Sequence, residues 1–83
     1  MFAVMMCSRA GTWDLIGDAW RPAYHVTTIC GEETREAALI AAARYAPAPG
    51  SFNREEAVVW IAPMESRFDR TTWPQSVLRR NPN

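Results

Sequence analysis

The chain has 83 residues, with nine basic and nine acidic side chains that give a formal net charge of zero, and 48% of its residues are apolar. A chain of this length buries only about 60–65% of the surface that its unfolded form exposes, which leaves room for one modest core and excludes a multi-domain enzyme. The balanced charge provides no long-range positive field to gather nucleic acid, and the aromatic and aliphatic content disfavours disorder. We therefore expect one small, soluble, folded domain.

The composition also indicates a source and a compartment. All nine cations are Arg and 13 residues are Ala, a bias typical of a GC-rich bacterial or phage genome. The apolar run at residues 2–7 follows no basic region and is shorter than the core of a signal peptide, and no stretch approaches the roughly 18 apolar residues of a membrane span. We expect a cytoplasmic location in a bacterial host cell, where Cys7 and Cys30 stay reduced.

The first part of the chain predicts three strands. Residues 2–8 form a continuous apolar run that is typical of a buried strand, and residues 9–12 predict a turn after it. Residues 13–16 predict a short second strand, closed by Gly17 and Asp18, that pairs back as a hairpin. Residues 24–30 predict a third strand, because five of these seven residues are β-branched or aromatic.

The middle of the chain predicts one helix. Residues 32–46 combine acidic residues in the opening turn with a run of helix formers, and Pro47 stops the helix. Because small side chains let a helix approach a sheet closely, we expect the helix to dock by an alanine-rich face from which Ala38 is left out. That face comprises Leu39, Ile40, Ala42, Ala43 and Ala46. Residues 47–51 predict a stiff, exposed connection.

Residues 57–62 carry two competing signals. Six apolar residues, three of them β-branched, predict a buried central strand. Asn53 with Glu56 three residues later has the spacing of a capping box, which predicts a helix over residues 53–62 instead. We favour the strand and keep the helix as the alternative.

Residues 64–83 predict a basic, aromatic C-terminal tail. Four Arg against two acids give it a formal charge of +2, and Thr72, Trp73 and Pro74 predict a short helix that ends near Asn81. Together the elements predict an α+β domain, a small and mostly antiparallel sheet in β-β-β-α-β order with one helix packed on one face. We expect residues 1–63 to form this domain and residues 64–83 to pack on it or extend from it.

The chemistry-bearing residues predict no standard catalytic or metal site. His25 and Cys30 are an odd number of residues apart on a strand, which predicts opposite faces, and apolar surroundings disfavour a thiolate at Cys7 or Cys30. The paired carboxylates at residues 32–33 and 55–56 do not converge on one point. The four Gly are scattered and form no phosphate-binding loop. We expect no catalytic residues, no metal, no cofactor and no enzymatic activity.

Aromatic and Arg side chains are the candidate partner-binding residues, because Trp, Tyr and Arg dominate the hot spots of protein interfaces. Cations around an aromatic ring fit an acidic protein groove or, through stacking and phosphate contacts, an RNA. The structural alternatives are Trp side chains that plug the ends of a small core and a tail that is a solvated terminus. The candidate residues are Arg67, Arg70, Trp73, Arg79, Arg80, Trp13, Trp20, Glu32, Glu33 and Glu36.

Two resemblances follow from these patterns. Residues 24–46, a strand that ends in Cys30 and Gly31 and continues into Glu-Glu-Thr-Arg-Glu-Ala-Ala, resemble the strand-to-helix junction of HicB-like antitoxins, which implies an antitoxin-like or RNA-contacting regulatory module. The whole profile of one short domain, no catalytic motif, many aromatics and uneven charge resembles the small phage proteins that disable host defence, anti-CRISPR proteins among them. That resemblance implies a non-enzymatic inhibitor that binds and blocks a host protein or nucleoprotein complex.

The expected partner is therefore a protein, alone or within a nucleoprotein complex. A single helix leaves the second face of a sheet open, and the tail, a second copy of the chain or the partner must cover that face. A homodimer and direct contact with nucleic acid stay open at this point, and no membrane partner is expected.

Overall fold

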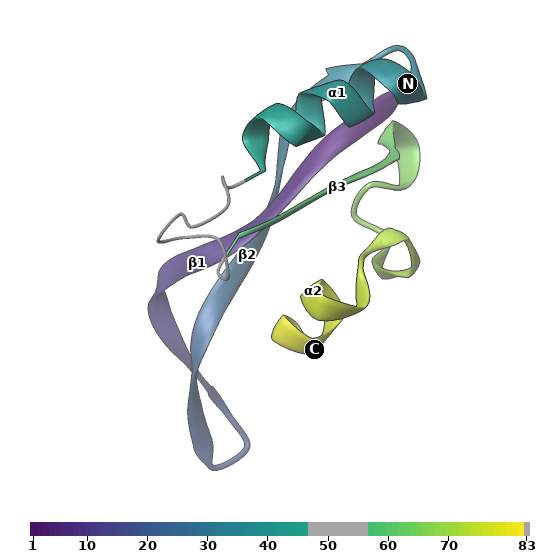
Figure 1. The fold of residues 1–83 in the computed structure, drawn as a ribbon. Helices are drawn as coiled ribbons and strands as arrows, with labels where there is room; N and C mark the ends of the chain where they lie inside the picture. Colours follow the sequence, from purple (N-terminus) through teal and green to yellow (C-terminus); the bar gives the residue numbers. More distant parts are fainter. Residues whose placement is uncertain (47–56, 83) are drawn as a thin grey trace.

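Three strands form one antiparallel sheet. In the computed structural model, which describes residues 1–46 and 57–82, β1 (Phe2–Ile16) lies between β2 (Ala19–Glu32) and β3 (Val58–Pro63) (Figure 1). The remaining elements are α1 (Arg35–Tyr45), η1 (Met64–Ser66), η2 (Arg70–Thr72) and α2 (Gln75–Arg80). The predicted α+β class with an antiparallel sheet is confirmed, as is the strand at residues 57–62. The capping signal at residues 53–56 and the connection at 47–51 lie outside the described residues.

A single hairpin replaces the three strands that the sequence predicts before the helix. The predicted turn at residues 9–12 is wrong, because β1 continues through it: Gly11 has a φ of 79° at a shift in register between Arg9 and Trp13. Glycine adopts a positive φ without a steric penalty, so the irregularity is absorbed within the strand. The first two predicted strands are one strand, and the order is β-β-α-β.

The chain reverses at Gly17 and Asp18. Ile16 pairs with Ala19 across this two-residue loop. Gly17 has a φ of 63°, and no non-glycine residue in the described part of the chain has a positive φ. A positive φ at the first loop residue alone is the requirement of a type II′ turn, whose twist matches that of the flanking strands. Gly17 and Asp18 therefore form the turn of a hairpin with two long strands.

β2 carries one extra residue near its end. The register shifts next to the Val4–Cys30 pair and leaves Ile29 without a partner on β1. His25 pairs with Ser8, four residues along β1 from Val4, so His25 and Cys30 lie on the same face of the sheet. The expectation that these two side chains lie on opposite faces is wrong, because a bulge reverses the alternation of side chains along a strand.

α1 docks on β1 and β3 by its smallest side chains. The predicted helix is confirmed and begins after Thr34, whose hydroxyl accepts a hydrogen bond of 3.1 Å from the N–H of Ala37. The predicted docking face is wrong, because Ala38 is fully buried. Most members of that face are exposed, namely Leu39, Ile40, Ala43 and Ala46, and Ala42 is half-buried. Residues 37, 38, 41 and 42 form the stripe that faces the sheet, where a methyl group sets the distance of closest approach.

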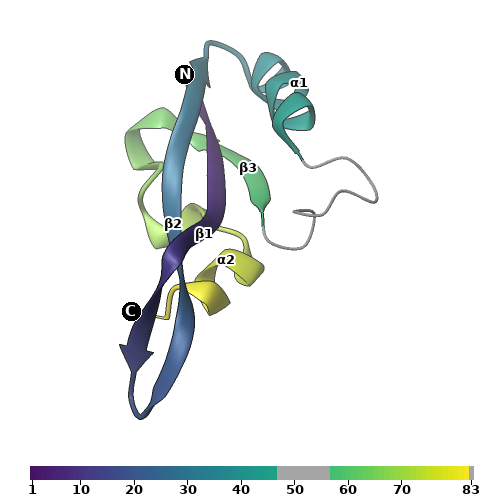
Figure 2. The same cartoon turned by 90° about the vertical axis from the view of Figure 1, so that its left-hand side faces the viewer.

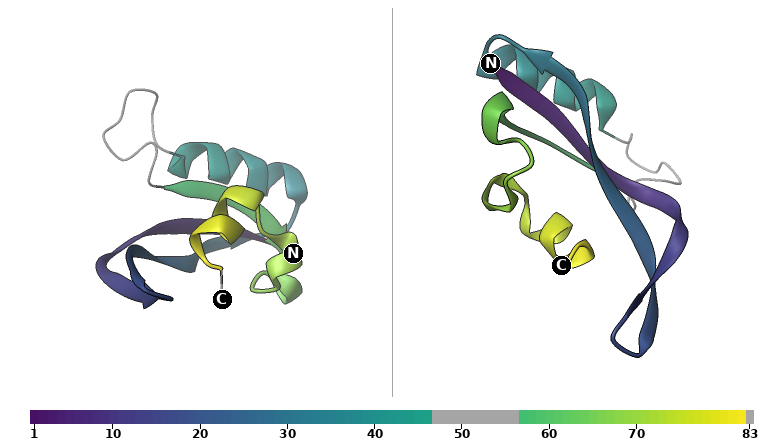
Figure 3. Two further views of the ribbon diagram at one scale, coloured as in Figure 1. Left: turned by 90° about the horizontal axis from the view of Figure 1, so that it is seen from below. Right: turned by 180° about the vertical axis from the view of Figure 1, so that it is seen from behind.

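The C-terminal residues cover the opposite face of the sheet (Figure 3). Alternate residues of β1 and β3 point to this face and pack with Val77 of α2, which is fully buried. The resulting core cluster comprises Ala3, Met5, Cys7, Trp60, Ala62 and Val77. The sheet therefore has α1 on one side and the segment after β3 on the other.

Side-chain contacts fasten the C-terminal segment. The ring centre of Trp73 lies 6.3 Å from that of Trp60, and the Trp73 Nε1–H donates a hydrogen bond of 3.0 Å to the carbonyl oxygen of Arg67. Arg70 donates a hydrogen bond to the carbonyl oxygen of Asn81. The residues that the sequence predicts as a tail thus pack against the sheet.

Asp69 fixes the start of η2. Its carboxylate accepts hydrogen bonds from the N–H and the hydroxyl of Thr71 at 3.0 and 2.8 Å. The backbone hydrogen bond, followed by the hydroxyl, holds the pKa of the Asp69 carboxyl below its ordinary value, because both stabilise the charged form. This contact orients the chain towards Trp73 and α2.

Candidate interaction surface

The outer part of the hairpin projects beyond the rest of the molecule (Figure 1), and Figure 2 shows the same projection from the side. The pairing of β1 with β3 ends at Cys7, and among the described residues the part of β1 beyond Cys7 pairs only with β2. We call residues 10–22 the hairpin arm; none of them is buried. The arm has no core of its own, and its side chains are available to another molecule.

One face of the hairpin arm is apolar. Trp13, Leu15 and Trp20 are 57%, 58% and 66% exposed. Leu15 pairs with Trp20 and Trp13 pairs with Pro22, and directly paired residues of antiparallel strands have their side chains on the same face. We call these four residues the Trp face. The guanidinium of Arg9 lies 5.8 Å from the centre of the Trp13 ring, a cation–π contact that restrains the ring before any partner arrives.

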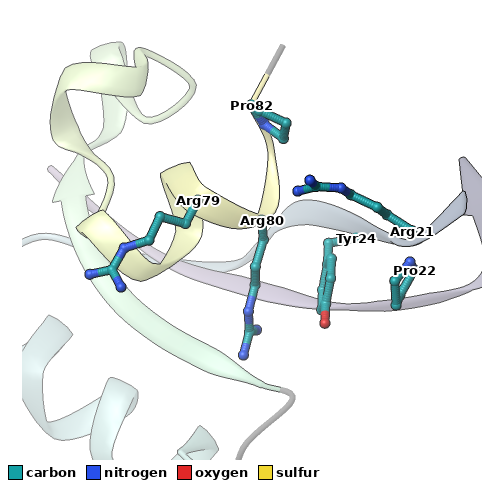
Figure 4. Close-up of a pocket in the computed structure, with 6 residues that line it drawn as sticks. All are labelled: Arg21, Pro22, Tyr24, Arg79, Arg80 and Pro82. Atoms are coloured by element: carbon teal, nitrogen blue, oxygen red, sulfur yellow. The ribbon is translucent and has the colours of Figure 1, made fainter. Parts of the chain in front are cut away.

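A pocket of about 200 Å³ lies between the base of the hairpin arm and α2 (Figure 4). It is lined by Arg21, Pro22, Tyr24, Arg79, Arg80 and Pro82, and we call it the Arg pocket. The guanidinium of Arg80 lies 4.7 Å from the centre of the Tyr24 ring, and the two side chains extend in the same direction in Figure 4. An adjoining hollow of about 110 Å³ is lined in part by Asp14 and Asn81.

The candidate residues of the C-terminal segment divide into two groups. Arg79 and Arg80 line the Arg pocket, whereas Arg67, Arg70 and Trp73 contact other parts of the chain. Arg67 donates one hydrogen bond of 3.1 Å to the Thr28 hydroxyl of β2 and another of 2.6 Å to the carbonyl oxygen of Met64. The structure therefore places Arg67, Arg70 and Trp73 in contacts that hold the C-terminal segment to the sheet.

The acidic candidates lie at the other end of the molecule. Glu32 is half-buried at the end of β2, and Glu33 and Glu36 are exposed around the start of α1. In Figure 1, α1 and the turn of the hairpin arm lie at opposite ends. The structure does not bring these carboxylates together with Trp13 and Trp20.

Five residues of the Trp face and the Arg pocket are absent from the sequence-based set, namely Leu15, Arg21, Pro22, Tyr24 and Pro82. A signal for Leu15 exists, because residues 13, 15, 20 and 22 alternate symmetrically about the two-residue turn. No comparable signal exists for Arg21 and Tyr24, since only the fold brings them to α2.

Comparison with protein-family models, with curated proteins and with solved structures finds no match. In the described residues, no three His, Cys, Asp or Glu side chains are grouped to hold a metal ion. None of the helices in residues 1–46 and 57–82 has the length and apolar character needed to cross a membrane.

Proposed function

We propose that this protein is a non-enzymatic protein-binding module that acts as a phage-type inhibitor, binding and blocking a host protein or nucleoprotein complex. The observation that carries the proposal is the Trp face, where two indole rings and Leu15 are more than half exposed on a projecting hairpin. A desolvated Trp anchor contributes about 2 kcal/mol or more to a protein interface, far more than a charge at its rim. The Trp face thus supplies the kind of contact on which protein binding depends.

The distribution of covered and uncovered surface supports the same proposal. Singly scattered apolar side chains are normal on a protein surface, whereas a contiguous strip of them marks an interaction site. The C-terminal segment covers one face of the sheet and α1 packs on the other, so the Trp face is the apolar strip for which these elements provide no cover.

A second candidate is an antitoxin-like or RNA-contacting module. The observation that favours it is the Arg pocket, in which three Arg and a Tyr ring offer cations and a stacking surface to a nucleotide. The formal net charge of zero argues against it, because binding to a phosphate backbone depends on a surplus of positive charge.

The test is capture of a target by the intact protein and by the Trp13→Ala/Trp20→Ala variant from a bacterial lysate, with and without nuclease treatment. The matched control is Phe68→Ala, which removes an aromatic ring that is 54% exposed in the C-terminal segment. We expect wild type and the control to retain the same protein and the double variant to retain at least about tenfold less, since each anchor carries more than the roughly 1.4 kcal/mol of a tenfold change.

The double variant should keep its thermal midpoint within about 3 °C of wild type, because its side chains lie outside the core. Equal retention by the double variant would contradict the proposal. Retention that disappears after nuclease treatment would instead favour the RNA-contacting module.

A further inference from the structure

We infer that the Arg pocket receives the carboxylates of an acidic segment of the protein partner. The inference rests on the proposed function, because it describes the chemistry of the same partner. Arg21 of the hairpin arm and Arg79 and Arg80 of α2 line the pocket, and none of the described residues that line it is acidic. Asp14 lines the adjoining hollow, so the described residues that line the two hollows comprise three cations and one carboxylate, a formal charge of +2 in a protein whose net charge is zero.

The arrangement of the guanidinium groups selects an extended acidic segment over a single small anion. In Figure 4, Arg21 points towards Pro82, Arg80 runs alongside Tyr24, and Arg79 extends away from both. A phosphate ion is held best where several donors converge on one point. An extended peptide places alternate side chains about 7 Å apart and can offer one carboxylate to each separate guanidinium.

The walls of the pocket strengthen such contacts. Pro22, Tyr24 and Pro82 contribute apolar surface, which lowers the local dielectric and increases the attraction between a carboxylate and a guanidinium. The Tyr24 ring also holds the Arg80 side chain in one place, which reduces the conformational entropy that Arg80 loses on binding.

The Arg pocket is continuous with the Trp face. Arg21 lies between Trp20 and Pro22 in sequence, and Pro22 belongs to both surfaces. A partner segment that packs apolar side chains on the Trp face can therefore place acidic side chains in the Arg pocket. The target expected from this geometry is an acidic surface segment with neighbouring apolar residues.

The experiment is a ¹H–¹⁵N NMR titration of the full chain with an acetylated and amidated hexaglutamate peptide. The parallel arms are a hexaglutamine peptide, inorganic phosphate and a single-stranded RNA hexanucleotide at the same ionic strength. We expect hexaglutamate to shift the signals of Tyr24 and of the Arg21 and Arg80 Nε–H groups, and hexaglutamine to leave them unchanged.

Variants locate the binding. Arg21→Gln should weaken hexaglutamate binding about threefold and Arg21→Gln/Arg80→Gln about tenfold, as expected for partly exposed ion pairs. Arg44→Gln, which removes the same charge from the exposed last turn of α1, should bind like wild type. Arg21 is exposed, so its single variant tests the pocket even where the double variant is less stable.

Three results would overturn the inference: hexaglutamate binding that both Arg variants retain in full, phosphate that binds the same residues as tightly, or RNA that binds them more tightly. These outcomes can be distinguished from a failure of the proposed function. A protein captured through the Trp face together with no hexaglutamate binding would refute the acidic segment alone. Hexaglutamate binding without any dependence of capture on the Trp face would refute the proposed function.

Discussion

Ala38 and its neighbours illustrate how single side chains position a helix. Ala38 of α1 is fully buried, whereas the bulkier Leu39 and Ile40 of the same helix are 45% and 53% exposed. The sequence does not identify the docking face of α1, because the helix has apolar residues on almost every side and several faces could pack on the sheet. Which stripe faces the sheet depends on how closely the helix can approach β1 and β3, and that is a property of the packed structure.

Substitution of these alanines tests the orientation of α1. Ala38→Glu should place an unpaired charge in the core and remove most or all of the several kcal/mol that stabilise a domain of this size. Ala43→Glu introduces the same side chain at an exposed position of the same helix and should change stability by less than about 0.5 kcal/mol. Urea denaturation measures both values. Equal midpoints for the two variants would show that α1 docks by another face.

The contact between Trp60 and Trp73 is a feature that the sequence does not predict. Trp60 and Trp73 are 13 positions apart, and their contact depends on how the chain turns through η1 and η2. The sequence identifies both as aromatic and gives no indication that the Trp73 N–H is satisfied by Arg67. Because Trp73 is close in sequence to several Arg, the sequence predicts a binding site there, whereas the structure places Trp73 against the core.

At the scale of elements, local signals predict most of the fold. Gly17 and Asp18 at the hairpin turn, the helix formers of α1 and the β-branched residues of β3 act within a few residues of their own position. The long strand β1 is the exception. A Gly in such a segment usually indicates a turn, whereas Gly11 lies at an irregularity within the strand. Distinguishing the two requires the pairing of residues 13–16 with β2, which is non-local.

The hairpin arm should be the least protected part of the sheet. Beyond Cys7 the strand β1 has no second neighbour within residues 1–46 and 57–82, and no side chain of the arm is buried, so local opening there disrupts few contacts. We expect the amides of residues 13–16 to exchange with deuterium on the order of 100-fold faster than those of residues 4–7, measured by NMR on the free protein. Uniform protection along β1 would mean that the arm is held by contacts outside the hairpin.

The central strand β1 contributes to two cores, one on each face of the sheet. Val4 on the α1 side and Met5 on the C-terminal side are both fully buried, although they are neighbours in β1. The sequence predicts that the second face of the sheet needs cover and leaves open what covers it. In the structure the C-terminal segment covers this face, and its Val77 is part of the core cluster.

Removal of the C-terminal segment should therefore abolish folding. A chain that ends at residue 63 would expose Met5, Cys7 and Trp60, which are buried in the intact protein. Burial of apolar surface contributes about 25 cal/mol per Å², and a domain of this size cannot lose one of its two cores and stay folded. Circular dichroism should show no cooperative thermal transition for residues 1–63. A cooperative transition near that of the full chain would establish residues 1–63 as an independent domain.

The four Trp fall into two pairs that differ in their surroundings. Trp13 and Trp20 are in contact with solvent, whereas Trp60 is buried in the core and the half-buried Trp73 packs against it. We therefore expect the intrinsic fluorescence of the protein to combine a long-wavelength emission from the first pair with a shorter-wavelength emission from the second. Acrylamide should quench the first pair preferentially, and a molecule that covers the hairpin arm should shield it. The Trp fluorescence of the protein can therefore report whether a molecule is bound to the hairpin arm, without any attached dye.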